Sequence, residues 1–106
     1  MQKSEQYEIL FSMLNAILVE MKALSQKKPD DALNEFKIKG VNKILEKVKE
    51  LLSNEPTVEF LEPLDEETLP KNSDAVFMIA QFKSAMEQFK TKYYTWDGDW
   101  DWRIDE

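Results

Sequence analysis

Three stretches of this sequence carry apolar residues at alternating intervals of three and four, and prolines separate the stretches. In the first stretch, the apolar residues with this spacing are Tyr7, Leu10, Leu14, Ile17, Met21 and Leu24. Such spacing places side chains on one stripe of an α-helix. The sequence therefore predicts a mostly α protein whose first helix covers residues 3–27, with Ser4 as its N-cap and Pro29 behind its end.

The second helix is expected over residues 31–53, where Asp30 or Asp31 can accept hydrogen bonds from the first free amides. Leu33 and Phe36 are expected to begin its apolar face. Because the link to the first helix is short, the two helices should form an antiparallel hairpin.

The third helix is expected over residues 74–93, with Ser73 as its cap. Its apolar stripe consists of Ile79, Phe82, Met86, Phe89 and Tyr93. A length of 106 residues fits one core. We therefore expect a single helical domain, residues 1–106, in which the helical hairpin and the third helix form a three-helix bundle.

Between the second and third helices, residues 54–73 form a connection interrupted by prolines. Residues 55–74 contain seven acids and one lysine, a net charge of −6. We expect a long acidic connection over the surface, with residues 57–61 extended and residues 65–69 in one helical turn. A connection longer than about 15 residues is unusual in a compact domain and is often functional.

The tail, residues 94–106, alternates aromatic and acidic residues. Asp97-Gly98 between two aromatic runs is typical of a two-residue type I′ hairpin turn. That turn would place Thr95 opposite Trp100 and Tyr93 opposite Trp102. An isolated hairpin is only marginally stable in water, so a short aromatic β-hairpin or extended tail should dock on the helices or on a partner.

The chain contains no cysteine and no histidine. Their absence removes disulfides, thiolate nucleophiles and imidazole acid–base groups. We find no phosphate-binding glycine loop and no nucleophile elbow in the sequence. We therefore expect no enzyme activity, no catalytic residue and no cofactor, and the lack of cysteine favours a cytoplasmic protein.

A net charge of −7 argues against direct binding to nucleic acid or to an anionic membrane. The apolar runs are also far shorter than the roughly 20 residues that span a bilayer. Asp97, Asp99 and Asp101 resemble the start of a calcium loop, but Trp102 stands where that loop needs glycine. We therefore expect no metal site.

The candidate partner-binding residues lie in the tail. They are Trp96, Asp99, Trp100, Asp101, Trp102 and Arg103. Tryptophan and arginine anchor many interfaces, although the tryptophans could instead complete the core of so small a chain. We expect a protein-binding or regulatory module whose partner is another protein, engaged by the tail together with the acidic connection.

Three alternatives remain open at the level of sequence. The acids could imitate nucleic-acid phosphates and block a basic protein site. The broad apolar faces of the first and third helices could instead make the chain a homodimerisation module. A small apolar ligand could also bind between helices, among Met13, Met21, Met78 and Met86.

Overall fold

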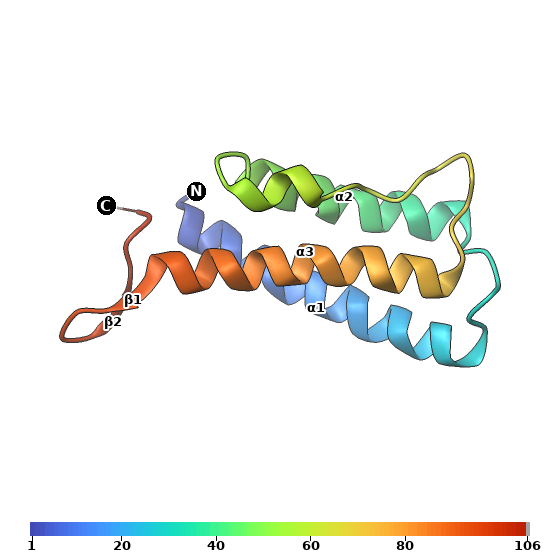
Figure 1. Ribbon diagram of the computed structural model, residues 1–106, viewed down its shortest axis with the longest axis horizontal. Coiled ribbons are helices and arrows are strands. Elements are labelled where there is room, and N and C mark those ends of the chain that lie inside the picture. Colours follow the sequence, from blue (N-terminus) through green and yellow to red (C-terminus); the bar gives the residue numbers. More distant parts are fainter. Residues whose placement is uncertain (106) are drawn as a thin grey trace.

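The apolar stripes of the helices meet in one core. The computed structural model describes residues 1–105, and Glu106, the last residue of the expected tail, lies outside the described residues. Within them, three α-helices pack together: α1 (Lys3–Lys27), α2 (Glu35–Leu51) and α3 (Asn72–Tyr93). The predicted mostly α bundle is confirmed, and its dimensions are 49 × 23 × 22 Å (Figure 1).

The direction of the helices explains the long connection. Figure 1 shows α1 running antiparallel to α2 and α3, which are parallel to each other. The 17 residues of α2 span about 25 Å, and the chain must travel back over this length before α3 can begin. The connection is therefore a crossover, which explains why it is longer than a turn between antiparallel helices.

Each helix contributes to the core in the predicted periodicity. Fully buried side chains at its centre include Tyr7, Leu14, Ile38, Leu45, Val48, Ile79, Phe82 and Met86. Burying one such side chain stabilises the fold by about 1.5–3 kcal/mol. Phe36 was expected to begin the apolar face of the second helix, but its side chain is 87% exposed and does not contribute to the core.

The predicted start of the second helix is wrong. Instead of beginning at residue 31, α2 begins at Glu35, and Asn34 caps it by accepting a hydrogen bond from the Lys37 amide at 2.8 Å. Residues 29–33 pair with the end of the connection, where the Leu33 amide donates to the Pro70 carbonyl at 2.8 Å. Pro29 and Asp30 form a turn, and Ala32 makes an isolated antiparallel bridge with Lys71, so the second helix begins only after this paired segment.

The predicted caps of the other two helices are also wrong. Ser73 lies inside α3, which begins at Asn72 after Lys71 in the cap position. The Asn72 side chain instead donates to the Lys28 carbonyl at 2.8 Å. Ser4 lies inside α1, where its amide and hydroxyl both donate to the carboxylate of Asp105. The end of the tail thus supplies an acceptor for the first turn of α1.

The connection differs in detail from its predicted form. Residues Pro56–Phe60 form a short 3₁₀ helix, η1, where an extended segment was expected. The expected helical turn over residues 65–69 is also absent from the described chain. The Asp65 carboxylate instead accepts from the Thr68 hydroxyl and from the amides of Glu67 and Thr68. These hydrogen bonds hold a tight turn and lower the pKa of Asp65, with that from the Thr68 hydroxyl the largest cause.

An antiparallel hairpin, β1 (Tyr94–Trp96) and β2 (Trp100–Trp102), follows α3. The predicted register is wrong by one residue, since Trp96 pairs with Trp100 and Tyr94 pairs with Trp102. The loop therefore has three residues, and Gly98 adopts a φ of 82° that favours glycine. A shift of one residue moves side chains to the other face, and here it brings all four aromatic rings to one side.

One buried side chain fastens the connection to the bundle. Asn42 on α2 is 6% exposed, and its amide donates to the Leu64 carbonyl at 2.8 Å. Its side-chain oxygen accepts from the Leu64 amide at 2.9 Å. This pair of hydrogen bonds satisfies both backbone groups of a buried residue in the crossover.

We predict that Asn42→Ala destabilises the protein by about 2–4 kcal/mol, because it leaves two buried backbone groups unpaired. Urea unfolding followed by circular dichroism measures the loss. The exposed Asn54 provides a matched control, and Asn54→Ala should change stability by less than about 0.5 kcal/mol. Equal unfolding midpoints for the two variants would contradict this role of Asn42.

Candidate functional site

The hairpin forms a ladder of four aromatic rings on one face. Tyr94 stacks on Trp100 with ring centroids 5.6 Å apart, and it also contacts Trp102 at 5.4 Å. Trp96 meets Trp100 edge to face at 5.9 Å. Aromatic cross-strand pairs of this kind stabilise a sheet and fix the positions of their rings.

The inner end of the ladder is part of the core. The Trp102 ring lies 5.0 Å from that of Tyr7 on α1 and 6.3 Å from that of Phe89 on α3. Ile104 packs against the same core. The marginal hairpin is therefore anchored through Trp102, and this tryptophan of the candidate set contributes to the fold.

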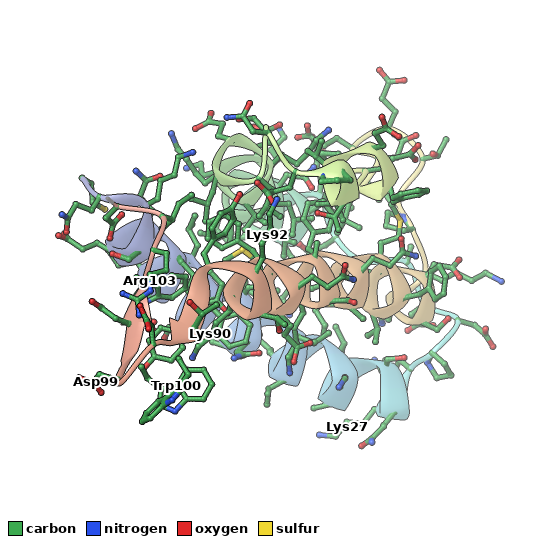
Figure 2. The ribbon with its side chains drawn as sticks, turned by 60° about the vertical axis from the view of Figure 1, so that its left-hand side comes forward. Lys27, Lys90, Lys92, Asp99, Trp100 and Arg103 are labelled. Atoms are coloured by element: carbon green, nitrogen blue, oxygen red, sulfur yellow. The ribbon has the colours of Figure 1, made fainter. Side chains whose placement is uncertain are left out.

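The outer end of the ladder is open to solvent. Trp96 is 62% exposed and Trp100 is 55% exposed, at the tip of the hairpin beside exposed Asp97 and Asp99. Figure 2 shows Trp100 and Asp99 projecting beyond the helices. Two large apolar rings and two carboxylates thus share a small surface, which we call the hairpin tip.

The remaining candidate residues lie apart from the rings. Asp101 pairs with Thr95 across the strands, so both lie on the face opposite the ladder. The Arg103 guanidinium donates to the Thr95 hydroxyl at 3.4 Å and lies 3.9 Å from the Asp101 carboxylate. The structure therefore brings Trp96, Asp99 and Trp100 together and assigns local contacts to Asp101 and Arg103.

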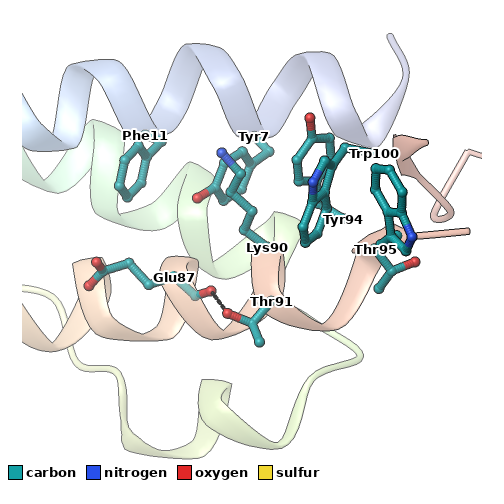
Figure 3. A pocket seen from close by; sticks show the side chains of 9 residues that line it. Tyr7, Phe11, Glu87, Lys90, Thr91, Tyr94, Thr95 and Trp100 are labelled. Atoms are coloured by element: carbon teal, nitrogen blue, oxygen red, sulfur yellow. Dashed lines mark hydrogen bonds between the residues drawn. The ribbon is translucent and has the colours of Figure 1, made fainter. Parts of the chain in front are cut away.

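Beside the ladder is a pocket that sequence reasoning missed. It measures about 610 Å³ and lies where the hairpin meets α1 and α3 (Figure 3). Its lining includes Tyr7, Phe11, Glu87, Lys90, Tyr94 and Trp100. The Lys90 ammonium lies 5.1 Å from the centroid of the Tyr94 ring, a cation–π contact. Only the spacing of four between Lys90 and Tyr94 could have indicated this contact from the sequence.

Tyr7 joins the pocket to the core. It is 1% exposed, and its ring stacks on Phe11 at 5.3 Å and on Phe89 at 5.8 Å. Among the described residues its hydroxyl has no hydrogen-bond partner. Burial raises the pKa of Tyr7 to about 12, and the negative charges of Glu8 and Glu87 add to the rise.

The acidic connection does not join the hairpin tip in one surface. Its residues 62–70 lie toward the opposite end of the bundle (Figure 1). Only its beginning reaches the hairpin end, where the Glu55 carboxylate accepts from the Tyr93 hydroxyl at 2.9 Å and from Lys92 at 3.1 Å.

Three further kinds of site were considered: a metal site, a membrane-spanning helix and a ligand site between methionines. Within residues 1–105, no three acidic side chains converge closely enough to hold a metal ion. None of the helices in this range has the length and apolar character needed to cross a membrane. Of the four methionines, Met21 and Met86 are buried in the core, Met78 is partly buried and lines a surface depression, and Met13 is 46% exposed.

Comparison with known proteins adds no assignment. The chain matches no protein-family model, no curated protein and no solved structure. Its function must therefore be argued from its own surfaces.

The two ends of the ladder should respond differently to truncation. We predict that Trp102→Ala destabilises the protein by about 2–3 kcal/mol, because it opens a gap against Tyr7 and Phe89. Trp100→Ala should cost less than about 1 kcal/mol, since more than half of that side chain is exposed. Urea unfolding followed by circular dichroism compares the two. An equal loss for both would place the hairpin tip in the core.

Tyr7 should make stability depend on pH in the alkaline range. Its pKa is about 12 in the folded protein against 10.0 normally, so its contribution is complete below pH 10. Between pH 10 and 12 the unfolded chain loses the proton while most of the folded protein keeps it, and stability should fall by about 2 kcal/mol. Urea unfolding at pH 9.5 and pH 11.5 should show this loss in the wild type and in Tyr94→Phe, but not in Tyr7→Phe.

Proposed function

We propose that this chain is a protein-binding module that engages a basic segment of another protein at its hairpin tip. The supporting observation is the exposure of Trp96 and Trp100 on a hairpin that Trp102 anchors in the core. Tryptophan dominates the binding energy of many interfaces. Because the ladder holds the rings in place, binding costs little additional conformational entropy.

The charge around the rings indicates the chemistry of the partner. Residues 97–106 carry five acids and one arginine, a net charge of −4. Asp97 and Asp99 flank the exposed rings, so an arginine or lysine could stack on a ring and pair with a carboxylate. The contact between Lys90 and the Tyr94 ring is an intramolecular example of the same attraction.

The geometry gives less support to a nucleic-acid mimic. Such a protein needs a continuous negative surface, yet residues 62–70 lie far from the hairpin tip (Figure 1). The helices between them are nearly neutral, since residues 75–96 contain three lysines and one glutamate. A basic segment contacting exposed tryptophans accounts better for a negative charge placed beside large apolar rings.

We predict that Trp96→Ser with Trp100→Ser abolishes capture of the partner from a lysate of the native host. Removing two central aromatic anchors typically weakens binding by at least about 100-fold. Phe36→Ser removes a ring that is even more exposed, at 87%, on another part of the surface. This variant should still capture the partner, as identified by mass spectrometry. Binding to the purified partner should also weaken as salt is raised.

Two results would count against this function. If all three baits capture the same proteins, the tip is not the binding surface. If the wild type is a dimer by light scattering and the tryptophan variant is a monomer, the tip binds a second copy of the chain instead.

A further inference from the structure

A second surface lies along α3, on the side that faces the acidic connection. Three depressions of about 480, 220 and 420 Å³ follow one another there. Phe60 and Gln81 line both the first and the second, and Thr57 and Gln88 line both the second and the third. The three therefore form one groove, the α3 trough, between α3 and residues 55–70.

The trough has the length of a helix. Its α3 wall extends from Asp74 to Lys92, which is about 27 Å at the rise of an α-helix. Its other wall is η1, which contacts α3, together with Leu61, Glu62 and Pro70 of the chain that follows. A helix of about five turns would fill it from end to end.

The α3 wall is uncharged between its two ends. The residues that line it there are Phe77, Met78, Gln81, Ser84, Ala85, Gln88, Phe89 and Thr91. One third of the chain is charged, and α3 itself carries Lys83, Glu87 and Lys90, which do not line these depressions. Depletion of charge together with aromatic enrichment is characteristic of the centre of a protein interface.

Two exposed phenylalanines lie at the end of the trough near Asp74. Phe60 on η1 is 73% exposed and Phe77 on α3 is 68% exposed. A single exposed apolar residue needs no explanation. These two come from different elements and line the same depression, so one docked side chain could contact both rings.

The charge beside this end is negative. Glu62 and Asp74 line the depression with the two rings, and exposed Glu59 lies on η1. At the far end Lys92 is paired with Glu55 at 3.1 Å, so that end is close to neutral. A second copy docked on the trough would bring two connections of −6 together. Like charge therefore disfavours self-association here and favours a basic occupant.

We propose that the α3 trough binds a basic amphipathic helix of another protein. Its walls are α3, η1 and the irregular chain after η1, and the only sheet among the described residues is the C-terminal hairpin. An occupant that satisfies its own backbone, as a helix does, therefore fits these walls better than an added strand. Apolar side chains at intervals of three and four would lie on Phe60, Phe77 and the neutral floor. Lysine or arginine beside them would face Glu59, Glu62 and Asp74.

The test uses a helical 18-residue probe peptide with leucine at intervals of three and four and lysine elsewhere. A matched probe carries glutamate in place of lysine. Amide shifts in NMR spectra of the labelled protein locate the bound probe, and fluorescence anisotropy gives its Kd. We expect the lysine probe to bind with its largest shifts in residues 57–62 and 74–88, and the glutamate probe to bind at least about tenfold more weakly.

The variants separate this trough from the rest of the surface. Phe60→Ser with Phe77→Ser should weaken the lysine probe at least about tenfold, whereas Phe36→Ser should not. Glu62→Lys with Asp74→Lys should weaken the lysine probe and strengthen the glutamate probe. Trp96→Ser with Trp100→Ser should change neither Kd, so failure at the hairpin tip is distinguishable from failure here.

Three outcomes would overturn the proposal. The lysine probe could fail to bind, or its amide shifts could fall on the hairpin tip or on α2. Phe36→Ser could weaken it as much as the double phenylalanine variant, which would indicate nonspecific attraction. Light scattering could also show a wild-type dimer that Phe60→Ser with Phe77→Ser makes monomeric, in which case the occupant is a second copy.

Discussion

The structure depends on the burial of the Tyr7 ring, because α1, α3 and the hairpin all meet there. Tyr7 contacts Phe11 on its own helix, Phe89 on α3 and Trp102 on the hairpin. A two-stranded hairpin has too little buried area to be stable alone. Docking Trp102 on this cluster turns it into a fixed platform, and the contact of Asp105 with Ser4 holds the end of the tail against α1. The exposure of Trp96 and Trp100 follows, since the ladder extends outward from an anchored inner end.

The parallel arrangement of α2 and α3 has a second consequence. The crossover between them must run the length of the bundle, and Asn42 fastens it at Leu64. The α3 trough lies between α3 and the part of this crossover that includes η1. The connection is long because it must run back along the bundle. This path requires neither its negative charge nor the exposure of Phe60.

Apolar periodicity predicted the three helices well, because burial of a stripe outweighs local preferences. The caps were predicted poorly, because Asp31 and Ser73 lie in segments whose backbone groups pair with residues distant in the sequence. Capping preferences depend only on residues close in the sequence, so they cannot indicate such pairing. The hairpin was found through Asp97-Gly98, but its register follows from pairing the rings on one face. Trp96, Asp99 and Trp100 could be selected from composition, whereas Tyr7 and Phe11 reach the site only through the packing of α1 on α3. The α3 trough was equally hidden, because its two walls are separate in the sequence.

The distribution of charge connects the two proposed surfaces. Acids spread evenly over a chain of net charge −7 would mainly provide solubility. Here carboxylates lie beside exposed rings twice, with Asp97 and Asp99 at Trp96 and Trp100, and with Glu62 at Phe60 and Phe77. Long-range attraction speeds the encounter with a basic partner, while the rings supply contact energy that salt does not screen. A partner lacking either positive charge or apolar side chains would gain only part of this energy. Both surfaces therefore favour basic amphipathic segments, although one lies beyond the C-terminal end of α3 and the other along its length (Figure 1).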